Sequence, residues 1–266
     1  MLSYFFIKAA AASLFAGFAC GIIGVWIYLL NMPFVGIAMA HTAFAGAVIG
    51  LLIGINPVFA AFVLCAASSF FIGPVAEKGN FSPNISTGIL FSFMLGIAFL
   101  FMGKLGSDAP QALSFMWGSI LTVSPEDVAL LAAVCAAILV FLFFFKRGIV
   151  AVIYNRSVAF ACGIPEKFIF YCLIILCAVT VSFNIKTVGG LLIYSLITIP
   201  AAAAAQFTKK LSLLYVLSSS FAVLSCLSGL AGSYLLDLPA GASIIVAASL
   251  IFGAVFAVKN LYGKHI

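Results

Sequence analysis

The chain has 266 residues, of which 66% are hydrophobic and only 7% are charged. A soluble globular domain needs a much more polar surface, so most of this surface faces lipid and no room is left for a separate soluble domain. The formal net charge is +6, but the basic residues are dispersed among the breaks between apolar runs, which favours membrane topology over a nucleic-acid-binding patch. We therefore expect an all-α, polytopic integral membrane protein that forms one transmembrane domain over residues 1–266.

The apolar runs set the number of membrane crossings, because a bilayer core about 30 Å thick needs about 20 apolar residues per helix. The predicted spans are 4–30, 34–54, 57–73, 85–103, 127–145, 167–184, 188–206, 211–236 and 239–258. The breaks at 31–34, 55–57 and 185–188 are tight, so two spans there can instead be one broken helix. Nine spans are expected, and eight is the competing count.

Basic residues predict the orientation, because Lys and Arg beside membrane helices are retained in the cytoplasm. An N-terminus outside and a C-terminus in the cytoplasm put most of them inside: Lys78, Lys146, Arg147, Arg156, Lys167, Lys209, Lys210, Lys259 and Lys264. Three fall outside or at the outer boundary: Lys8, Lys104 and Lys186. This orientation places the loop 146–167 in the cytoplasm and the loop 104–127 outside.

The outer loop contains QALSFMWGSILT at 111–122, which is too short and interrupted to cross a bilayer but apolar enough to lie along its surface or dip into the protein. We predict an interfacial or re-entrant helix there. Ser124, Pro125, Glu126 and Asp127 then form a helix start, with a hydroxyl cap, a proline and two acids facing the positive end of the helix dipole. Helix capping accounts for both acids.

Motifs for catalysis are missing from the sequence. It contains no GxxxxGK[ST] phosphate loop, GxSxG, HExxH or paired intramembrane aspartates, so the chain is not expected to be an enzyme or to bind a cofactor itself. The cysteines lack the paired CxxC spacing of zinc and redox sites, and we interpret them as small packing residues. They are Cys20, Cys65, Cys135, Cys162, Cys172, Cys177 and Cys226.

His41 is the only histidine inside a predicted span. A neutral imidazole is a common ligand of transition metals, although an isolated histidine can equally be hydrogen-bonded in helix packing. The same helix carries a stripe of small residues at four-residue steps, which lets another helix approach closely: Ala38, Thr42, Gly46, Gly50 and Gly54. His41 flanks this stripe and can line a pore. Gly17 and Gly21 form a similar packing pair in the first span.

The seventh span contains Pro200, which removes a backbone donor, frees the carbonyl of Leu196 and allows a kink. The hydroxyls of Ser195 and Thr198 either satisfy that freed backbone or contribute oxygens to a solute path. The doublet at 189–190 permits local unwinding, because both residues are glycine.

The cytoplasmic loop contains NRSVAFACGIPEKF. Asn155 and Ser157 can cap a short helix that runs through Ala161 and ends at Gly163 and Pro165. Such a helix is either a solvated connector or an element that docks into a partner.

Five segments in order along the chain resemble the metal-type ABC permeases, the membrane subunits of bacterial zinc, manganese and iron importers, and most of all the Znu-type zinc permeases. They are FVGIAMAHTAFAGAVIGLLIGINP at 34–57, WGSILTVSPEDV at 117–128, SVAFACGIP at 157–165, TVGGLLIYSLITIPAAAAAQF at 187–207 and LPAGASIIVAASLIF at 238–252.

The resemblance implies a homodimer of permeases in the bacterial cytoplasmic (inner) membrane, two cytoplasmic ATPases that bind ATP and Mg²⁺, and an extracytoplasmic metal-binding protein. It also implies that the loop at about 154–166 docks into the ATPase and couples its closure to the membrane. The coupling residues would be Asn155, Arg156, Ser157, Ala159, Gly163 and Glu166.

His41 matches the family histidine that is thought to contact the ion in the pathway. The sequence departs from the family at Ile37, where an aspartate is usual, and at Ser92, which takes the place of a second histidine. The pathway is therefore poor in ligands, although two His41 residues could meet across a twofold axis.

We expect import of a divalent transition metal by alternating access, with Thr42, Ser195, Thr198 and Pro200 as pathway or hinge residues. Zinc is the first choice, followed by manganese and iron. The alternatives are a permease for a metal chelate or other small solute, a secondary carrier or channel, and a structural membrane subunit; a carrier should show repeats or a charged relay, and neither is found.

Overall fold

The protein is described by a computed structural model that covers residues 2–79, 82–118, 123–190 and 192–262. Within these ranges all regular secondary structure is helical, which confirms the all-α prediction. The elements are α1 (Leu2–Leu29), α2 (Phe34–Ile53), α3 (Pro57–Gly79), α4 (Pro83–Met102), η1 (Gly106–Asp108), α5 (Ala109–Trp117), α6 (Pro125–Tyr154), α7 (Arg156–Ala161), α8 (Glu166–Asn184), α9 (Ile193–Phe207), α10 (Leu211–Leu236) and α11 (Ala240–Tyr262).

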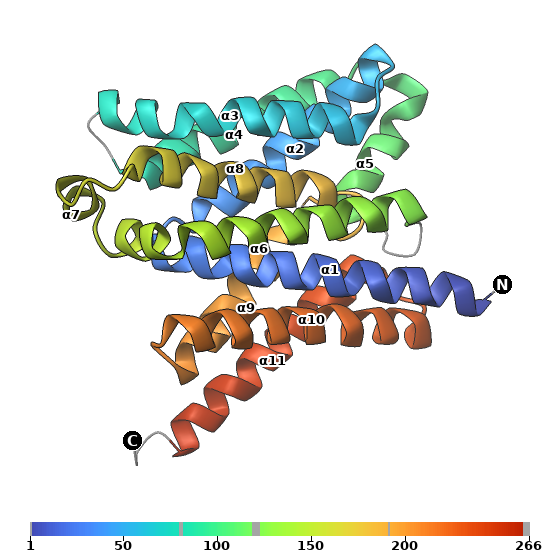
Figure 1. The fold of residues 1–266 in the computed structure, drawn as a ribbon. Helices are drawn as coiled ribbons and strands as arrows, with labels where there is room; N and C mark the ends of the chain where they lie inside the picture. Colours follow the sequence, from blue (N-terminus) through green and yellow to red (C-terminus); the bar gives the residue numbers. More distant parts are fainter. Residues whose placement is uncertain (1, 80–81, 119–122, 191, 263–266) are drawn as a thin grey trace.

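Each predicted span corresponds to a separate helix. Among the described residues, seven helices are long and apolar enough to cross a membrane, and Pro57–Ile72 and Ile193–Phe207 are shorter apolar helices. The N-terminus and α5 lie at one end of the bundle, while α7 and the C-terminal helix end lie at the other (Figure 1). The distribution of basic residues predicts the same grouping, with the N-terminus and the segment 104–127 at one end and the segment 146–167 and the C-terminus at the other. Lys264 is outside the described residues.

Three predicted boundaries differ from the structure by five residues or more. Helix α3 continues to Gly79 and does not end at 73. Helix α6 continues to Tyr154 and does not end at 145, because Lys146 and Arg147 are good helix formers whose exposed side chains can reach the polar boundary. The loop expected at 146–167 is therefore mostly helical. Helix α9 begins at Ile193 and not at 188, since Gly189 has a φ of +98° that a right-handed helix cannot contain.

The small-residue stripes pack helices closely, as predicted. A Cβ added to Gly17 would lie 2.8 Å from the Cα of Val223 on α10, and one added to Gly46 would lie 2.6 Å from the Cα of Ala61 on α3. Gly54 is an exception, because it ends α2 at a φ of +74° and would meet nothing within 4 Å. Its role is a left-handed helix cap and not a packing contact.

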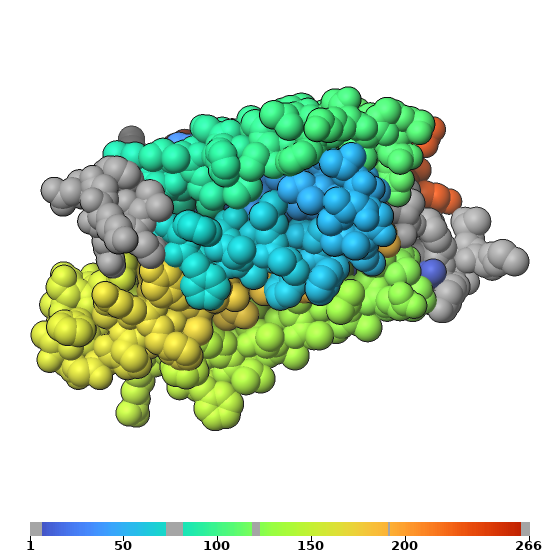
Figure 2. Space-filling view, turned by 90° about the horizontal axis from the view of Figure 1, so that it is seen from above, coloured from blue at the N-terminus to red at the C-terminus, as the bar shows by residue number. Residues whose placement is uncertain are grey.

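Helix α2 occupies the interior. It packs against α3, α4, α8 and α9, and fourteen of its residues, including His41 and Thr42, are buried. Helix α7, in contrast, is peripheral: its yellow segment lies at one end of the molecule in the space-filling view (Figure 2).

Candidate functional site

His41 lies in the buried first half of α2, with 7% of its surface exposed. Its Nδ1 is 3.0 Å from the carbonyl oxygen of Ile37. Because a carbonyl only accepts, Nδ1 carries the proton of the neutral imidazole and Nε2 keeps its lone pair. The ring packs edge to face against Phe91 on α4, with centroids 4.7 Å apart. The local structure thus orients the imidazole and leaves one nitrogen able to bind a metal.

The described residues of one chain do not form a complete metal site. Within the part that the structure describes, no group of three or more His, Cys, Asp or Glu side chains is placed to hold a metal ion. Ile37 contributes only its carbonyl, which is already bonded to His41. Ser92 is exposed on α4, next to Phe91 in sequence, and its hydroxyl donates to the carbonyl of Gly88 at 3.1 Å.

A buried break between α8 and α9 lies beside this part of α2. Its backbone polar groups are bonded: the N–H of Val188 donates to Asn184 at 2.9 Å, and the N–H of Gly190 donates to the carbonyl of Phe115 at 2.8 Å. A Cβ on Gly190 would lie 3.5 Å from the carbonyl oxygen of Ala40, the residue before His41. Buried backbone polar groups need hydrogen-bond partners, and these two bonds supply partners within the break. The break confirms the predicted unwinding at 189–190.

Three glycines from distant segments meet at this break, and we name Gly118, Gly189 and Gly241 the glycine junction. Gly118 follows α5 with a φ of +66°, Gly189 has a φ of +98°, and Gly241 is the second residue of α11. A Cβ on Gly118 would lie 2.6 Å from the carbonyl oxygen of Val188, and one on Gly241 would lie 2.7 Å from the carbonyl oxygen of Trp117. The backbones therefore touch directly, and side chains larger than hydrogen do not fit.

Helix α5 covers part of the segment for which an interfacial or re-entrant helix was predicted; residues 119–122 lie outside the described ranges. Its end is tied to the buried break through Phe115 and the glycine junction. Beside α5 a hollow of about 650 Å³ is lined by Gln111, Ser114, Trp117 and Lys186 among others. Helix α5, which borders this hollow, lies at the end of the molecule opposite α7 (Figure 1).

The start of α6 contains the predicted cap and an ion pair that the sequence did not predict. Ser124 and Asp127 form a reciprocal capping box. The same carboxylate of Asp127 accepts from Nζ of Lys186 at 2.7 Å, which ties α6 to the break between α8 and α9. Asp127 thus has a tertiary role in addition to helix capping.

The pathway or hinge residues of α9 are not gathered around His41 by any contact that the structure shows. Pro200 lies inside α9, as predicted. The hydroxyl of Thr198 donates to Tyr194 at 2.8 Å and not to the carbonyl of Leu196 that Pro200 frees, because a threonine hydroxyl reaches the carbonyl four residues earlier. Thr42 makes the equivalent bond to Ala38 at 2.8 Å.

Helix α7 is fixed at its base and exposed at its tip. The side chain of Asn155 caps it by accepting from the N–H groups of Ser157 and Val158, so the predicted capping role of Ser157 is wrong. Arg156 pairs with the buried Glu166 at 2.9 Å, and its guanidinium lies 4.1 Å from the ring centre of Phe170. The helix turn ends at Gly163, whose φ is +75°.

The exposed side of α7 is apolar. Ala159 is buried against the bundle, whereas Val158 and Phe160 are 58% and 72% exposed. An apolar tip on a braced helix at the polar end of a membrane bundle is typical of a surface that binds another protein.

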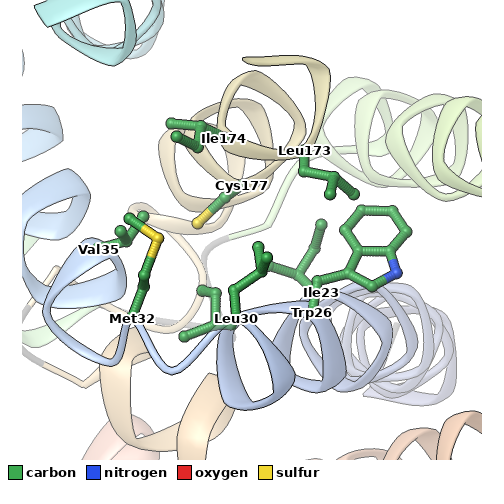
Figure 3. A pocket seen from close by; sticks show the side chains of 9 residues that line it. Ile23, Trp26, Leu30, Met32, Val35, Leu173, Ile174 and Cys177 are labelled. Atoms are coloured by element: carbon green, nitrogen blue, oxygen red, sulfur yellow. The ribbon is translucent and has the colours of Figure 1, made fainter. Parts of the chain in front are cut away.

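The small pocket between α1, α2 and α8 is not a second candidate for the ion site. Met32 and Cys177 point into it beside Val35, Leu173 and Ile174 (Figure 3). Its volume is only about 10 Å³ and its lining is apolar. That is about the space of one water molecule, with no polar partners to hold it.

Residues 3–259 match the model of the ABC 3 transport family. The chain belongs to the ABC 3 transport family. The manganese transport system membrane protein MntC of Halalkalibacterium halodurans is 30% identical over 259 residues, which cover 96% of this chain and 88% of that protein. The high-affinity zinc uptake system membrane protein ZnuB of Haemophilus influenzae is 25% identical over 230 residues, covering 86% and 88% respectively.

A solved structure, PsaBC from Streptococcus pneumoniae in complex with Fab, contains a chain that superposes on this ABC 3 protein with a TM-score of 0.83 and 25% identity, covering 96% of this chain and 95% of that one. The permease family predicted from the five segments is therefore confirmed. The expected preference for the zinc branch is not supported, because manganese relatives are at least as similar as the zinc relative.

Proposed function

We propose that the chain is the membrane-spanning subunit of an ATP-driven importer of a divalent transition metal. The observation that carries this proposal is the environment of His41, an intramembrane imidazole whose Nδ1 is fixed by Ile37 and whose Nε2 is left to bind. Membership of the ABC 3 family and relatives named for manganese and zinc transport support it. We place manganese level with zinc, ahead of iron.

The ion site is completed by a second copy of the chain. The described residues of one chain form no group of three or more metal-ligating side chains that includes His41, and a twofold dimer would bring two equivalent histidines to the axis. Such a site binds weakly, which suits transport, because an ion that crosses must also be released. Thr42, Ser195, Thr198 and Pro200 act as pathway or hinge residues in this proposal.

Energy enters through a separate cytoplasmic ATPase that binds ATP and Mg²⁺ and docks on α7. The exposed Val158 and Phe160 form the contact, while Asn155, Arg156, Ser157, Ala159, Gly163 and Glu166 build and brace the loop that carries it. At the opposite end an extracytoplasmic metal-binding protein delivers the ion beside α5. The chain itself is then no enzyme, and it lies in the bacterial inner membrane with its N-terminus outside and its C-terminus in the cytoplasm.

The test is ATP-dependent uptake of radioactive manganese, zinc and iron into vesicles that contain the chain, its ATPase and its binding protein. We expect His41→Gln, which keeps a polar side chain of similar size, to lower uptake of one ion at least about tenfold while the complex stays assembled. Phe91→Leu is the control, since it alters the packing against His41 without removing a ligand.

Unchanged uptake in His41→Gln would exclude His41 from the pathway. ATP hydrolysis without movement of any of the three ions would favour the alternative cargo, a metal chelate or another small solute, for which the ligand-poor surroundings of His41 leave room. Uptake without ATP would instead identify a secondary carrier, and no uptake defect on deletion in metal-limited cells would identify a structural subunit.

A further inference from the structure

A groove runs along the outside of the bundle between α6 and α10, with α1 as its floor. Figure 1 shows α1 lying between these two helices. The groove has a volume of about 340 Å³, with Phe18 and Ile22 on its floor, Leu139 and Leu142 on the α6 side, and Tyr215 and Val216 on the α10 side. Leu139 and Val216 are 44% and 61% exposed, so the groove is open to its surroundings.

The wall formed by α10 also contains hydroxyl groups. Ser219 lines the groove, is only 6% exposed, and has a hydroxyl with no hydrogen-bond partner within the described structure. Ser220 beside it is exposed and lines the same groove. A buried hydroxyl without a partner is unfavourable, so an acceptor group inside the groove would be stabilised there.

The end of the groove nearest α7 is bordered by four cations. Lys146 follows Leu142 by four residues, which places it one turn further along the same face of α6, and Arg147 is next to it. Lys209 and Lys210 directly precede α10. All four are exposed, and none takes part in the two ion pairs that the described residues form, Arg156 with Glu166 and Lys186 with Asp127.

We propose that this groove binds an anionic phospholipid from the leaflet on the α7 side. The apolar walls take an acyl chain, Ser219 and Ser220 donate to the ester region, and the cations from α6 and α10 bind the phosphate headgroup. Basic residues at this depth attract anionic headgroups, and pockets between membrane helices with a basic rim are sites for them. A zwitterionic lipid would leave the four positive charges without a compensating charge.

A lipid suits the groove better than a second copy of the chain. A symmetric contact at this face would bring two sets of four cations together, and like charges at an interface are unfavourable. A bound anionic lipid instead neutralises them and bridges α6 to α10. Because α6 continues to Tyr154 at the base of α7, the lipid would also fix the helix that supports the α7 loop.

The experiment measures lipid retention by native mass spectrometry of the purified chain in detergent, with added phosphatidylglycerol or phosphatidylcholine. We expect wild type to retain phosphatidylglycerol in preference to phosphatidylcholine. The double variant Lys146→Gln with Lys210→Gln should bind phosphatidylglycerol at least about tenfold more weakly. The matched control, Lys104→Gln with Lys167→Gln, removes the same charge from exposed positions outside the groove and should bind as wild type does.

A third variant tests the groove itself. Ser220→Phe fills it without changing charge, and we expect it to lose the retained lipid while the thermal unfolding temperature without added lipid stays within a few degrees of wild type. Equal retention of the two lipids by wild type would overturn the proposal. So would equal retention by the double variant and its charge-matched control, or undiminished binding by Ser220→Phe.

Discussion

The two ends of the bundle hold their short helices in opposite ways. At one end α7 is fixed by side chains: the Asn155 cap, the pair of Arg156 with Glu166, and the stacking of Arg156 on Phe170. At the other end α5 is fixed by backbone, through the bond from Gly190 to Phe115 and the direct contacts of the glycine junction. At one end α7 exposes an apolar tip, and at the other α5 packs against α2, with Ala112 and Phe115 buried.

This difference predicts how each end responds to change. Side-chain contacts can weaken one at a time, so the α7 end should loosen locally while the bundle stays folded. At the glycine junction backbone atoms contact each other directly, and no side chain can move aside to make space. A single added methyl group should therefore disturb α5, the break before α9 and the start of α11 together.

The largest effect is expected from Gly189→Ala. Its φ of +98° is unfavourable for any residue with a Cβ, and that Cβ would lie 2.6 Å from the carbonyl oxygen of Met116. We expect a loss of about 3 kcal/mol or more of stability, seen as a lower unfolding temperature or a failure to purify folded protein. Gly253→Ala is the control, because a Cβ there meets nothing within 4 Å and the helix should gain about 0.5–1 kcal/mol. Similar unfolding temperatures for the two variants would contradict the proposed rigidity of the glycine junction.

An intermediate and local effect is expected from Arg156→Ala. It leaves Glu166, whose side chain is only 9% exposed, without its cation and removes the contact with Phe170. We expect about 1–3 kcal/mol of local destabilisation, measured as faster amide hydrogen exchange in α7. Global unfolding should change little, and ATP-dependent uptake in the reconstituted complex should fall more than ATP hydrolysis does.

The control for that variant is Lys167→Ala, an exposed cation next to Glu166. It removes a charge at the same end without breaking the pair and should leave hydrogen exchange in α7 unchanged. If Arg156→Ala instead unfolds the whole bundle, then the two ends do not differ in the way their contacts indicate.

The sequence predicted the elements of this fold well, because the length of each apolar run fixes a membrane helix almost by itself. The capping box at Ser124 and Asp127 and the close packing at Gly17 and Gly46 followed from local spacing. The end of α6 was not predicted correctly, because charged residues such as Lys146 and Arg147 can either continue a helix or end a membrane span. Boundaries of this kind depend on how far a helix extends beyond the lipid.

The site was predictable only in part. His41 stood out chemically, but its bond to Ile37 and its contact with Phe91 depend on rotamers and on a helix that is distant in sequence. The glycine junction joins residues from three segments, and no single segment contains the signal that they meet. Lys186 and Asp127 are 59 positions apart, and each had a sufficient local explanation without the other.

The smallest effect is expected from Asp127→Asn, which tests whether the ion pair or the glycine junction holds the end near α5. The amide keeps an acceptor for the N–H of Ser124 but loses the charge that pairs with Lys186. Since the Lys186 side chain is 36% exposed, we expect a loss of only about 1 kcal/mol, and a smaller dependence of the unfolding temperature on salt than in wild type. Glu126→Gln, at the exposed neighbouring acid, controls for the loss of charge near the helix start. A loss as large as that of Gly189→Ala would show that this end, too, depends on a side-chain contact, and the contrast between the two ends would no longer hold.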